Sequence, residues 1–168
     1  MKPIKHLIFK APEKWMHLRE IARNLNISPN TVSKSIAELR KKGIVEEKKE
    51  VNMRMFRANF DNETYKHEKR VYNLQNIYDS GITSFLFEYY NPKAIALFGS
   101  YSRGEDISTS DIDIGIITNE KKRPNLTMFE KKLSRNIELS LFTRKKVSKE
   151  FFNSIINGIV LTGFLANE

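Results

Sequence analysis

Two carboxylates separated by a single residue carry the first chemical signal in the chain. Asp111 and Asp113 flank Ile112, and isoleucine recurs at Ile114. In an extended strand, residues two apart point to the same face. The carboxylates would then share one face, with Cα atoms about 6.5–7 Å apart, and the isoleucines the other. Two such carboxylates can bind one or two divalent cations, which also take phosphate oxygens as ligands. The pattern therefore predicts metal-assisted chemistry on a phosphorylated substrate.

A Gly-Ser pair lies upstream of this acidic pair. Gly99 and Ser100 follow the apolar run 94–98, and ten residues separate Ser100 from Asp111. The apolar run predicts a buried strand, and glycine allows the backbone to approach a phosphate closely. If a helix begins directly after Ser100, its free N–H groups would point at the same anion. A phosphate-holding turn beside a metal-binding pair indicates a nucleoside triphosphate as substrate.

Arg103 follows this turn and offers a positive charge. It is placed either to neutralise phosphate charge or to form an ion pair with Glu105 or Asp106, and the residues alone leave both alternatives open. Gly104 is expected to end the short helix, because glycine adopts the left-handed conformation that commonly follows a last helical turn.

A third carboxylate is needed if the site is to activate a hydroxyl group. Glu138 lies in the run 136–142, where alternating apolar residues predict a strand, and it projects from the face opposite to theirs. If this strand neighbours the strand 111–117, Glu138 can reach the acidic pair and act as general base or metal ligand. Glu130 is the alternative, but it lies in the helical run 126–133, where we expect it to be solvated.

The beginning of the chain predicts two short helices joined by a tight turn. Apolar residues recur at helical spacing over 18–25, and a second stripe with the i, i+4, i+7 pattern covers 32–39. Ser28 is a good N-cap and Pro29 a good first helical residue, so the second helix is expected to start there. Gly43 follows a basic last turn and is expected to end that helix.

Two extended runs, 44–51 and 53–60, predict a small hairpin after these helices. The segment 18–45 closely resembles the winged helix-turn-helix domains of archaeal and bacterial transcription regulators, and the resemblance covers most of residues 3–60. It implies that the second helix enters the major groove of double-stranded DNA. The alternative is a winged helix used only for protein contacts or dimerisation. The predicted DNA-binding residues are Asn30, Thr31, Ser33, Lys34 and Ser35, expected to be exposed on the second helix, and Arg40, Lys48, Lys49 and Arg54, expected at the phosphates.

Residues 61–83 are interpreted as a connecting helical segment. Residues 61–63 suit a helix start, and Ser80 with Gly81 marks a break. An apolar stripe crosses that break, and we expect it to pack the two domains together or to cover the sheet that follows. A dimer interface is the alternative, because the stripe is rich in aromatic residues. The stripe consists of Val71, Leu74, Tyr78, Ile82, Phe85 and Tyr89.

Composition restricts the class of protein. The chain has 168 residues and a net charge of +9. It contains no cysteine, which excludes disulfides and thiolate metal sites. Residues 1–60 contain 14 basic and 6 acidic residues, whereas residues 61–168 contain 15 and 14, so only the first part is expected to meet a polyanion. No apolar run approaches the roughly 20 residues of a membrane helix, and no signal-peptide core is visible. We therefore expect no membrane contact and a cytoplasmic location.

The Gly-Ser turn, the ten-residue loop and the Asp-Ile-Asp run together resemble the polymerase-beta-type nucleotidyltransferase superfamily, in particular its minimal members, over roughly residues 84–165. The resemblance implies a mixed sheet flanked by helices, and transfer of a nucleoside monophosphate from a triphosphate to an acceptor hydroxyl. Some members are antitoxins that adenylylate a partner toxin, and many carry aspartate at the third acidic position. The resemblance further implies nucleotide binding by Gly99, Ser100, Arg103 and Ser110, and metal binding and catalysis by Asp111, Asp113 and Glu138.

These features predict an α/β protein (α+β overall) with a winged helix-turn-helix domain over 1–60, a connecting helix over 61–83 and a minimal nucleotidyltransferase domain over 84–168. The expected reaction is Mg²⁺-dependent transfer of AMP from ATP, with Mn²⁺ as an alternative ion. The resemblance also suggests a toxin-like protein partner, autoregulation through DNA, and a homodimer. One alternative is a transcriptional regulator that senses a nucleotide without turnover, and another is nucleotide addition to an RNA end.

Overall fold

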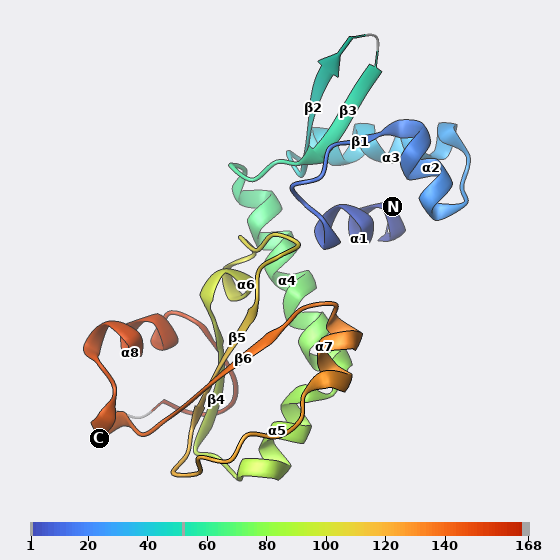
Figure 1. Cartoon of the computed structure of the whole chain (residues 1–168). Coiled ribbons are helices and arrows are strands. Elements are labelled where there is room, and N and C mark those ends of the chain that lie inside the picture. The colour runs from blue at the N-terminus through green and yellow to red at the C-terminus, as the bar shows by residue number, and fades with distance from the viewer. Residues whose placement is uncertain (1, 52, 166–168) are drawn as a thin grey trace. The chain divides into compact units, whose positions relative to one another are not determined.

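The computed structural model describes residues 2–51 and 53–165 of the chain (Figure 1). The chain divides into two compact units, residues 1–69 and 70–168, and the division falls within one long helix. Each unit has its own sheet, so each is described by itself. Among the described residues, no helix is both long and apolar enough to cross a membrane.

The first unit is a winged helix-turn-helix, as the sequence predicts. In its described part, short helices pack with an antiparallel sheet in which β3 lies between β1 and β2. The helix α1 and the two-residue strand β1 are additions that sequence patterns did not predict. The elements are α1 (Lys2–Lys10), β1 (Met16–His17), α2 (Leu18–Leu25), α3 (Pro29–Lys41), β2 (Val45–Glu50) and β3 (Met53–Ala58).

The bounds of α3 follow from local chemistry. The Ser28 side chain accepts a hydrogen bond from the backbone N–H of Thr31 at 3.1 Å, and Pro29 occupies the first turn, so the predicted start is confirmed. After the last turn, Gly43 adopts a φ of +74°, a conformation that favours glycine. The predicted apolar stripe over 32–39 is buried.

Ser35 corrects one sequence expectation about α3. It was expected to be exposed, but its side chain is 8% exposed. Ser35 lies three residues after Val32 and four before Leu39, which places it beside the buried stripe. A small hydroxyl side chain can pack there, so polarity alone was a poor guide to exposure. The face that α3 offers to a ligand consists of Asn30, Thr31, Ser33 and Lys34, all exposed.

The connecting segment forms α4 (Glu63–Ser80) and α5 (Ile82–Tyr90), with the expected break at Gly81, where φ is +83°. The predicted apolar stripe is wrong in part, because Val71 is 68% exposed and Tyr78 is 47% exposed. The buried positions include Asn73 and Ile77 instead. Asn73, a polar residue, lies on the buried face of α4. The left-handed Gly81 then rotates α5 relative to the helical periodicity of α4. A single apolar stripe drawn across Gly81 therefore includes exposed residues of α4.

The second unit contains a mixed four-stranded sheet in its described part, in the order β6-β5-β4-β7. Strands β5 and β6 are parallel, whereas β4 is antiparallel to both β5 and β7. This confirms the predicted mixed sheet flanked by helices. The elements are β4 (Ala94–Phe98), α6 (Gly99–Arg103), β5 (Ile112–Ile117), α7 (Thr127–Leu133), β6 (Ile137–Phe142), a 3-10 turn (Arg144–Lys146), α8 (Lys149–Ile156) and β7 (Ile159–Gly163).

Helices cover both faces of this sheet (Figure 1). Ile112, Ile114 and Ile116 of β5 are fully buried against residues of α4, α5 and α7. On the other face, a Cβ placed on Gly115 would meet Ile155 of α8 at 3.2 Å. Because alternate strand residues share a face, Asp113 projects to the α8 side, away from the large core.

Candidate active site and nucleic-acid interface

Strand register brings three predicted site positions to one edge of the sheet. Phe98 at the end of β4 pairs with Asp113 of β5, and Asp113 pairs in turn with Glu138 of β6. Neighbouring strands lie about 4.7–4.9 Å apart, so the start of α6, Asp113 and Glu138 are adjacent across three strands. The sequence expectation that the Glu138 strand neighbours the acidic strand is confirmed.

Gly99 is required by its conformation and by its neighbour. Its φ is +70°, and a Cβ added there would overlap the Asp113 carboxylate. The Ser102 hydroxyl donates to the Gly99 carbonyl at 2.8 Å, a contact within the short helix α6 that directly follows β4. Gly104 ends α6 at a φ of +73°, as predicted. The backbone turn is therefore packed directly against the central carboxylate.

The electrostatics of the edge centre on Asp113. Burial raises the pKa of Asp113 above its ordinary value, and the negative charges of Asp111 and Glu138 raise it further, while Arg103 lowers it. The half-buried Asp113 carboxylate is thus repelled by two exposed carboxylates, those of Asp111 and Glu138. Carboxylate oxygens are the ligands that hard divalent cations prefer, and a cation bound beside Asp113 would offset both the repulsion and the desolvation.

The three acidic side chains are neighbours, but they do not converge on one point. Asp111 directly precedes β5, and its Oδ1 accepts a hydrogen bond from the Asn136 side chain at 3.1 Å. Glu138 Oε1 lies 3.5 Å from an Arg123 guanidinium nitrogen, and both of these side chains are exposed. Within residues 2–51 and 53–165, no three His, Asp or Glu side chains are gathered closely enough to hold a metal ion.

The residues around the Gly-Ser turn are held by local contacts. Arg103 Nε donates to Glu105 Oε2 at 2.7 Å, which selects one of the ion pairs left open by the sequence. Asp106 is fully buried, and it accepts from the Asn73 side chain at 2.6 Å. The Ser110 hydroxyl accepts from the Ile107 backbone N–H at 3.0 Å, so this serine also shapes the loop before Asp111.

Glu130 is not simply solvated, contrary to the sequence expectation. Its Oε1 accepts a hydrogen bond from the backbone N–H of Ile137 at 3.2 Å, and its side chain is half-buried. The contact ties α7 to the first residue of β6, the strand that carries Glu138. A helical pattern alone could not show it, because the partner is a backbone group of another element.

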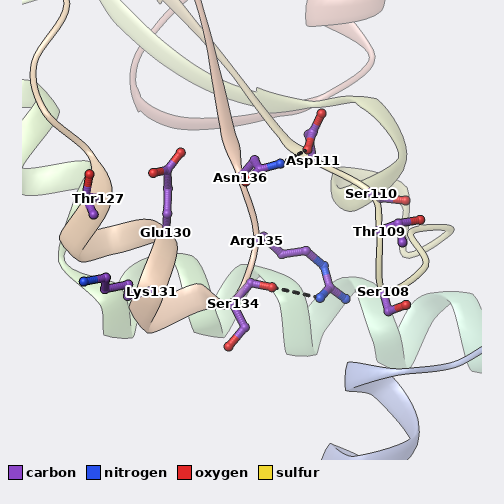
Figure 2. A pocket seen from close by; sticks show the side chains of 10 residues that line it. All are labelled: Ser108, Thr109, Ser110, Asp111, Thr127, Glu130, Lys131, Ser134, Arg135 and Asn136. Atoms are coloured by element: carbon purple, nitrogen blue, oxygen red, sulfur yellow. Dashed lines mark hydrogen bonds between the residues drawn. The ribbon is translucent and has the colours of Figure 1, made fainter.

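We call the end of the sheet that carries Asp111, Asp113 and Glu138 the acidic edge. A cavity of about 370 Å³ adjoins it (Figure 2). It lies between α7 and the loop that leads to Asp111, and its lining includes Ser108, Glu130, Arg135 and Asn136. Neither Arg135 nor Asn136 was predicted as a site residue, although Asn136 opens the predicted run 136–142 and Arg135 directly precedes it, which was a usable signal. Asp111 itself lines the cavity, and Asn136 faces it there and donates to it.

Two of the predicted DNA-binding arginines of the first unit share one carboxylate. Arg40 of α3 and Arg54 of β3 both contact Glu47 of β2, with the Arg40 nitrogen 2.6 Å from Glu47 Oε2. Glu47 is 17% exposed in its side chain, and the Arg54 hydrogen bond lowers the pKa of Glu47 below its ordinary value. Sequence analysis missed Glu47, because the strand pairing that brings β2 and β3 together creates the contact.

The hairpin of β2 and β3 is the wing of this domain. Its residue Lys48 makes two contacts. Its ammonium nitrogen is 3.0 Å from Glu50 Oε2 and 4.7 Å from the centre of the Trp15 ring. The Arg57 guanidinium also lies over the Trp15 ring, 4.5 Å from its centre. Lys49 is exposed. The basic surface predicted from charge is therefore present, but much of it is ordered by internal contacts.

Comparisons with known proteins follow the division into two units. A family described as "Polymerase beta, Nucleotidyltransferase" matches residues 80–163, and one described as "Winged helix-turn-helix DNA-binding" matches residues 16–46. A protein of Methanocaldococcus jannaschii named "Putative protein adenylyltransferase" is 35% identical over 74 residues, which cover 40% of this chain and 72% of that protein.

Proposed function

The chain belongs to the polymerase beta nucleotidyltransferase family and carries a winged helix-turn-helix domain, and from this premise we propose that it transfers AMP from ATP to an acceptor hydroxyl. The name of the M. jannaschii relative favours adenylyl transfer to a protein. Mg²⁺ is the proposed ion, with Mn²⁺ as a substitute, because the donors are carboxylate oxygens.

One observation carries this proposal. The pairing of Phe98 with Asp113, and of Asp113 with Glu138, sets the Gly-Ser turn beside two carboxylates on adjacent strands. The overlap that a Cβ on Gly99 would make with Asp113 supports direct contact between the turn and the acidic edge. A structural role alone does not require mutually repelling carboxylates at a half-buried position.

The proposed chemistry assigns a role to each side chain. Backbone N–H groups at Gly99 and Ser100 would bind the β- and γ-phosphates, and Asp111 and Asp113 would hold the metal ion. When bound, this ion supplies Lewis-acid stabilisation of the phosphate charge. Glu138 accepts the proton of the acceptor hydroxyl. The acceptor oxygen then bonds to the α-phosphorus, the bridging α–β P–O bond breaks, and pyrophosphate leaves with the electron pair.

Arg103 and Ser110 have supporting roles in this scheme. Arg103 is exposed and paired with Glu105, so it can exchange that partner for a phosphate oxygen. Ser110 orders the loop directly before Asp111 and offers its hydroxyl to the nucleotide. Both residues are therefore expected to affect nucleotide affinity more than the chemical step.

The first unit is proposed to bind double-stranded DNA through α3 and the wing. Asn30, Thr31, Ser33 and Lys34 would face the bases, while Arg40, Lys48, Lys49 and Arg54 would contact phosphates. Fusion of such a domain to an adenylyltransferase favours an autoregulator of the antitoxin type in the cytoplasm, working on a toxin-like partner. A homodimer would match the two-fold symmetry common in DNA half-sites.

The test is transfer of label from [α-³²P]ATP in the presence of Mg²⁺ and candidate protein acceptors. Label transfer with pyrophosphate release, lost in Asp111→Asn/Asp113→Asn, is the expected result. Saturable ATP binding without pyrophosphate release would instead identify a nucleotide sensor. Label on an RNA end, and not on protein, would identify the RNA alternative.

A further inference from the structure

A large cavity of the second unit lies at the opposite end of its sheet from the acidic edge. It has a volume of about 820 Å³ and is lined by residues from four segments that meet at this end of the sheet. Strand β4, Ala94–Phe98, separates the two ends, which corresponds to about 16 Å at 3.3 Å per residue. The cavity is therefore distinct from the proposed catalytic edge. Its lining includes Tyr90, Lys93, Thr118, Arg144, Lys146 and Phe164.

The position of this cavity in the fold favours ligand binding. The parallel strands β5 and β6 end at Ile117 and Phe142, and the segments that directly follow them, 117–120 and 143–146, form part of its wall. In α/β sheets, ligands commonly bind outside the carboxyl ends of parallel strands, where loops converge. The cavity volume also lies within the range of pockets that take small ligands, about 300–1,000 Å³.

The charge of the lining favours an anion. Lys93, Arg144 and Lys146 contribute three cations, against the single carboxylate of Glu120. The Arg144 guanidinium lies over the Phe152 ring, 4.6 Å from its centre, which limits its freedom. An arginine held in this way loses less conformational entropy when it binds a phosphate.

The same cavity offers aromatic surface. Phe164 lines it and is 76% exposed, an unusual exposure for a large apolar ring. Tyr90 is buried, and its hydroxyl donates to the Lys122 carbonyl at 2.8 Å, so its ring is fixed in the wall. A ligand that combines a planar ring with a negative group would cover Phe164 and contact the basic side chains of the same lining.

We propose that this cavity is a second ligand site, separate from the catalytic edge, that binds a nucleoside monophosphate. The phosphate lies against Arg144 and Lys146, and the base stacks on Phe164. Three cations and the Glu120 carboxylate give the lining a net charge of +2, which matches the double negative charge of one phosphomonoester. The site requires no divalent metal, in contrast to the acidic edge.

The experiment is isothermal titration of the full chain with AMP in EDTA, up to about 5 mM nucleotide. Saturable binding to one site is expected, and Arg144→Ala/Lys146→Ala weakens it by about tenfold or more. Phe164→Ala weakens AMP binding by about fivefold but leaves pyrophosphate binding unchanged, because only AMP carries a base. The matched control is Lys121→Ala/Lys122→Ala, which removes the same charge from a neighbouring loop outside the lining and is expected to bind AMP normally.

The Asp111→Asn/Asp113→Asn variant separates this site from the proposed function. It is expected to bind AMP in EDTA as the wild type does, whatever the outcome of the transfer assay. Absence of saturable binding overturns the second site, and so does binding lost in Asp111→Asn/Asp113→Asn but kept in Arg144→Ala/Lys146→Ala. Equal binding of AMP by Phe164→Ala and by the wild type contradicts the role of the ring. Melting temperatures near that of the wild type show that each variant is folded.

Discussion

The acidic edge of the second unit and the basic face of the first unit treat charge in opposite ways. At the acidic edge, burial and the charges of Asp111 and Glu138 raise the pKa of Asp113, and the charge of Arg103 lowers it. On the basic face, Glu47 contacts both Arg40 and Arg54, so cations are compensated internally. The carboxylates of the acidic edge would be stabilised electrostatically by any cation that binds them. The arginines of the basic face must instead break internal ion pairs before they can bind phosphates.

The largest effect is expected from loss of the central carboxylate. Asp113→Asn removes a proposed metal ligand, so kcat should fall by at least about 10³-fold in the transfer assay. The same change removes repulsion at a half-buried position, so the free energy of unfolding at neutral pH should rise by about 1 kcal/mol. Denaturant unfolding with metal chelated measures this gain. Loss of activity together with loss of stability would show instead that the residue supports the fold.

The next effect concerns the turn packed against that carboxylate. Gly99→Ala places a Cβ on the Asp113 carboxylate and imposes a strained φ, so activity should fall by about 100-fold and stability by about 2–3 kcal/mol. The matched control is Gly81→Ala, which has a φ of +83° but no atom within 4 Å of the added Cβ. It should cost about 1 kcal/mol and leave turnover unchanged. Equal effects of the two substitutions would contradict the contact with Asp113.

A smaller effect concerns the proton of Asp113 in the metal-free protein. Carboxyl ¹³C NMR should show Asp113 titrating above the ordinary aspartate range, since its pKa is raised. Asp111→Asn should lower that pKa by removing repulsion, and Arg103→Ala should raise it by removing a cation. The native state then holds this proton more tightly than the unfolded state. Stability should therefore fall as pH rises from the ordinary to the raised pKa, and Asp113→Asn should lose this dependence.

The smallest effect is expected on the basic face. Glu47→Gln frees Arg40 and Arg54 to contact phosphates, so DNA affinity should rise about threefold to tenfold. The salt dependence of binding should become steeper by an amount that corresponds to about one or two additional phosphate contacts. The matched control is Glu46→Gln, because Glu46 contacts Arg57, which lies outside the proposed DNA-binding set. Fluorescence anisotropy at several salt concentrations measures both quantities. Weaker binding by Glu47→Gln would mean that the carboxylate positions the arginines for DNA.

Patterns local in sequence predicted much of this fold. Strand alternation identified β5 and β6, and the capping residues Ser28 and Pro29 identified the start of α3. These signals depend on a few neighbouring residues and on steric rules. The adjacency of the Glu138 strand was inferred from the chemistry that a third carboxylate would serve, and the sheet order confirmed it.

Features created by tertiary contact were not predictable in this way. Glu47, Glu130 and Asn136 acquire their partners only when separate elements meet. Burial of Ser35 and Asn73 depends on the face of a helix and not on polarity. The cavity at the far end of the sheet combines segments far apart in the chain, so its charge and ring could not be seen together in the sequence.

The most direct test of the acidic edge is Mn²⁺ binding in the presence of a non-hydrolysable ATP analogue, followed by electron paramagnetic resonance. The wild type should bind Mn²⁺ at the edge, and Asp113→Asn should weaken that binding by about 100-fold, while Arg144→Ala/Lys146→Ala leaves it unchanged. Mn²⁺ affinity that is the same in the wild type and in Asp113→Asn would contradict a metal-nucleotide site formed by these carboxylates.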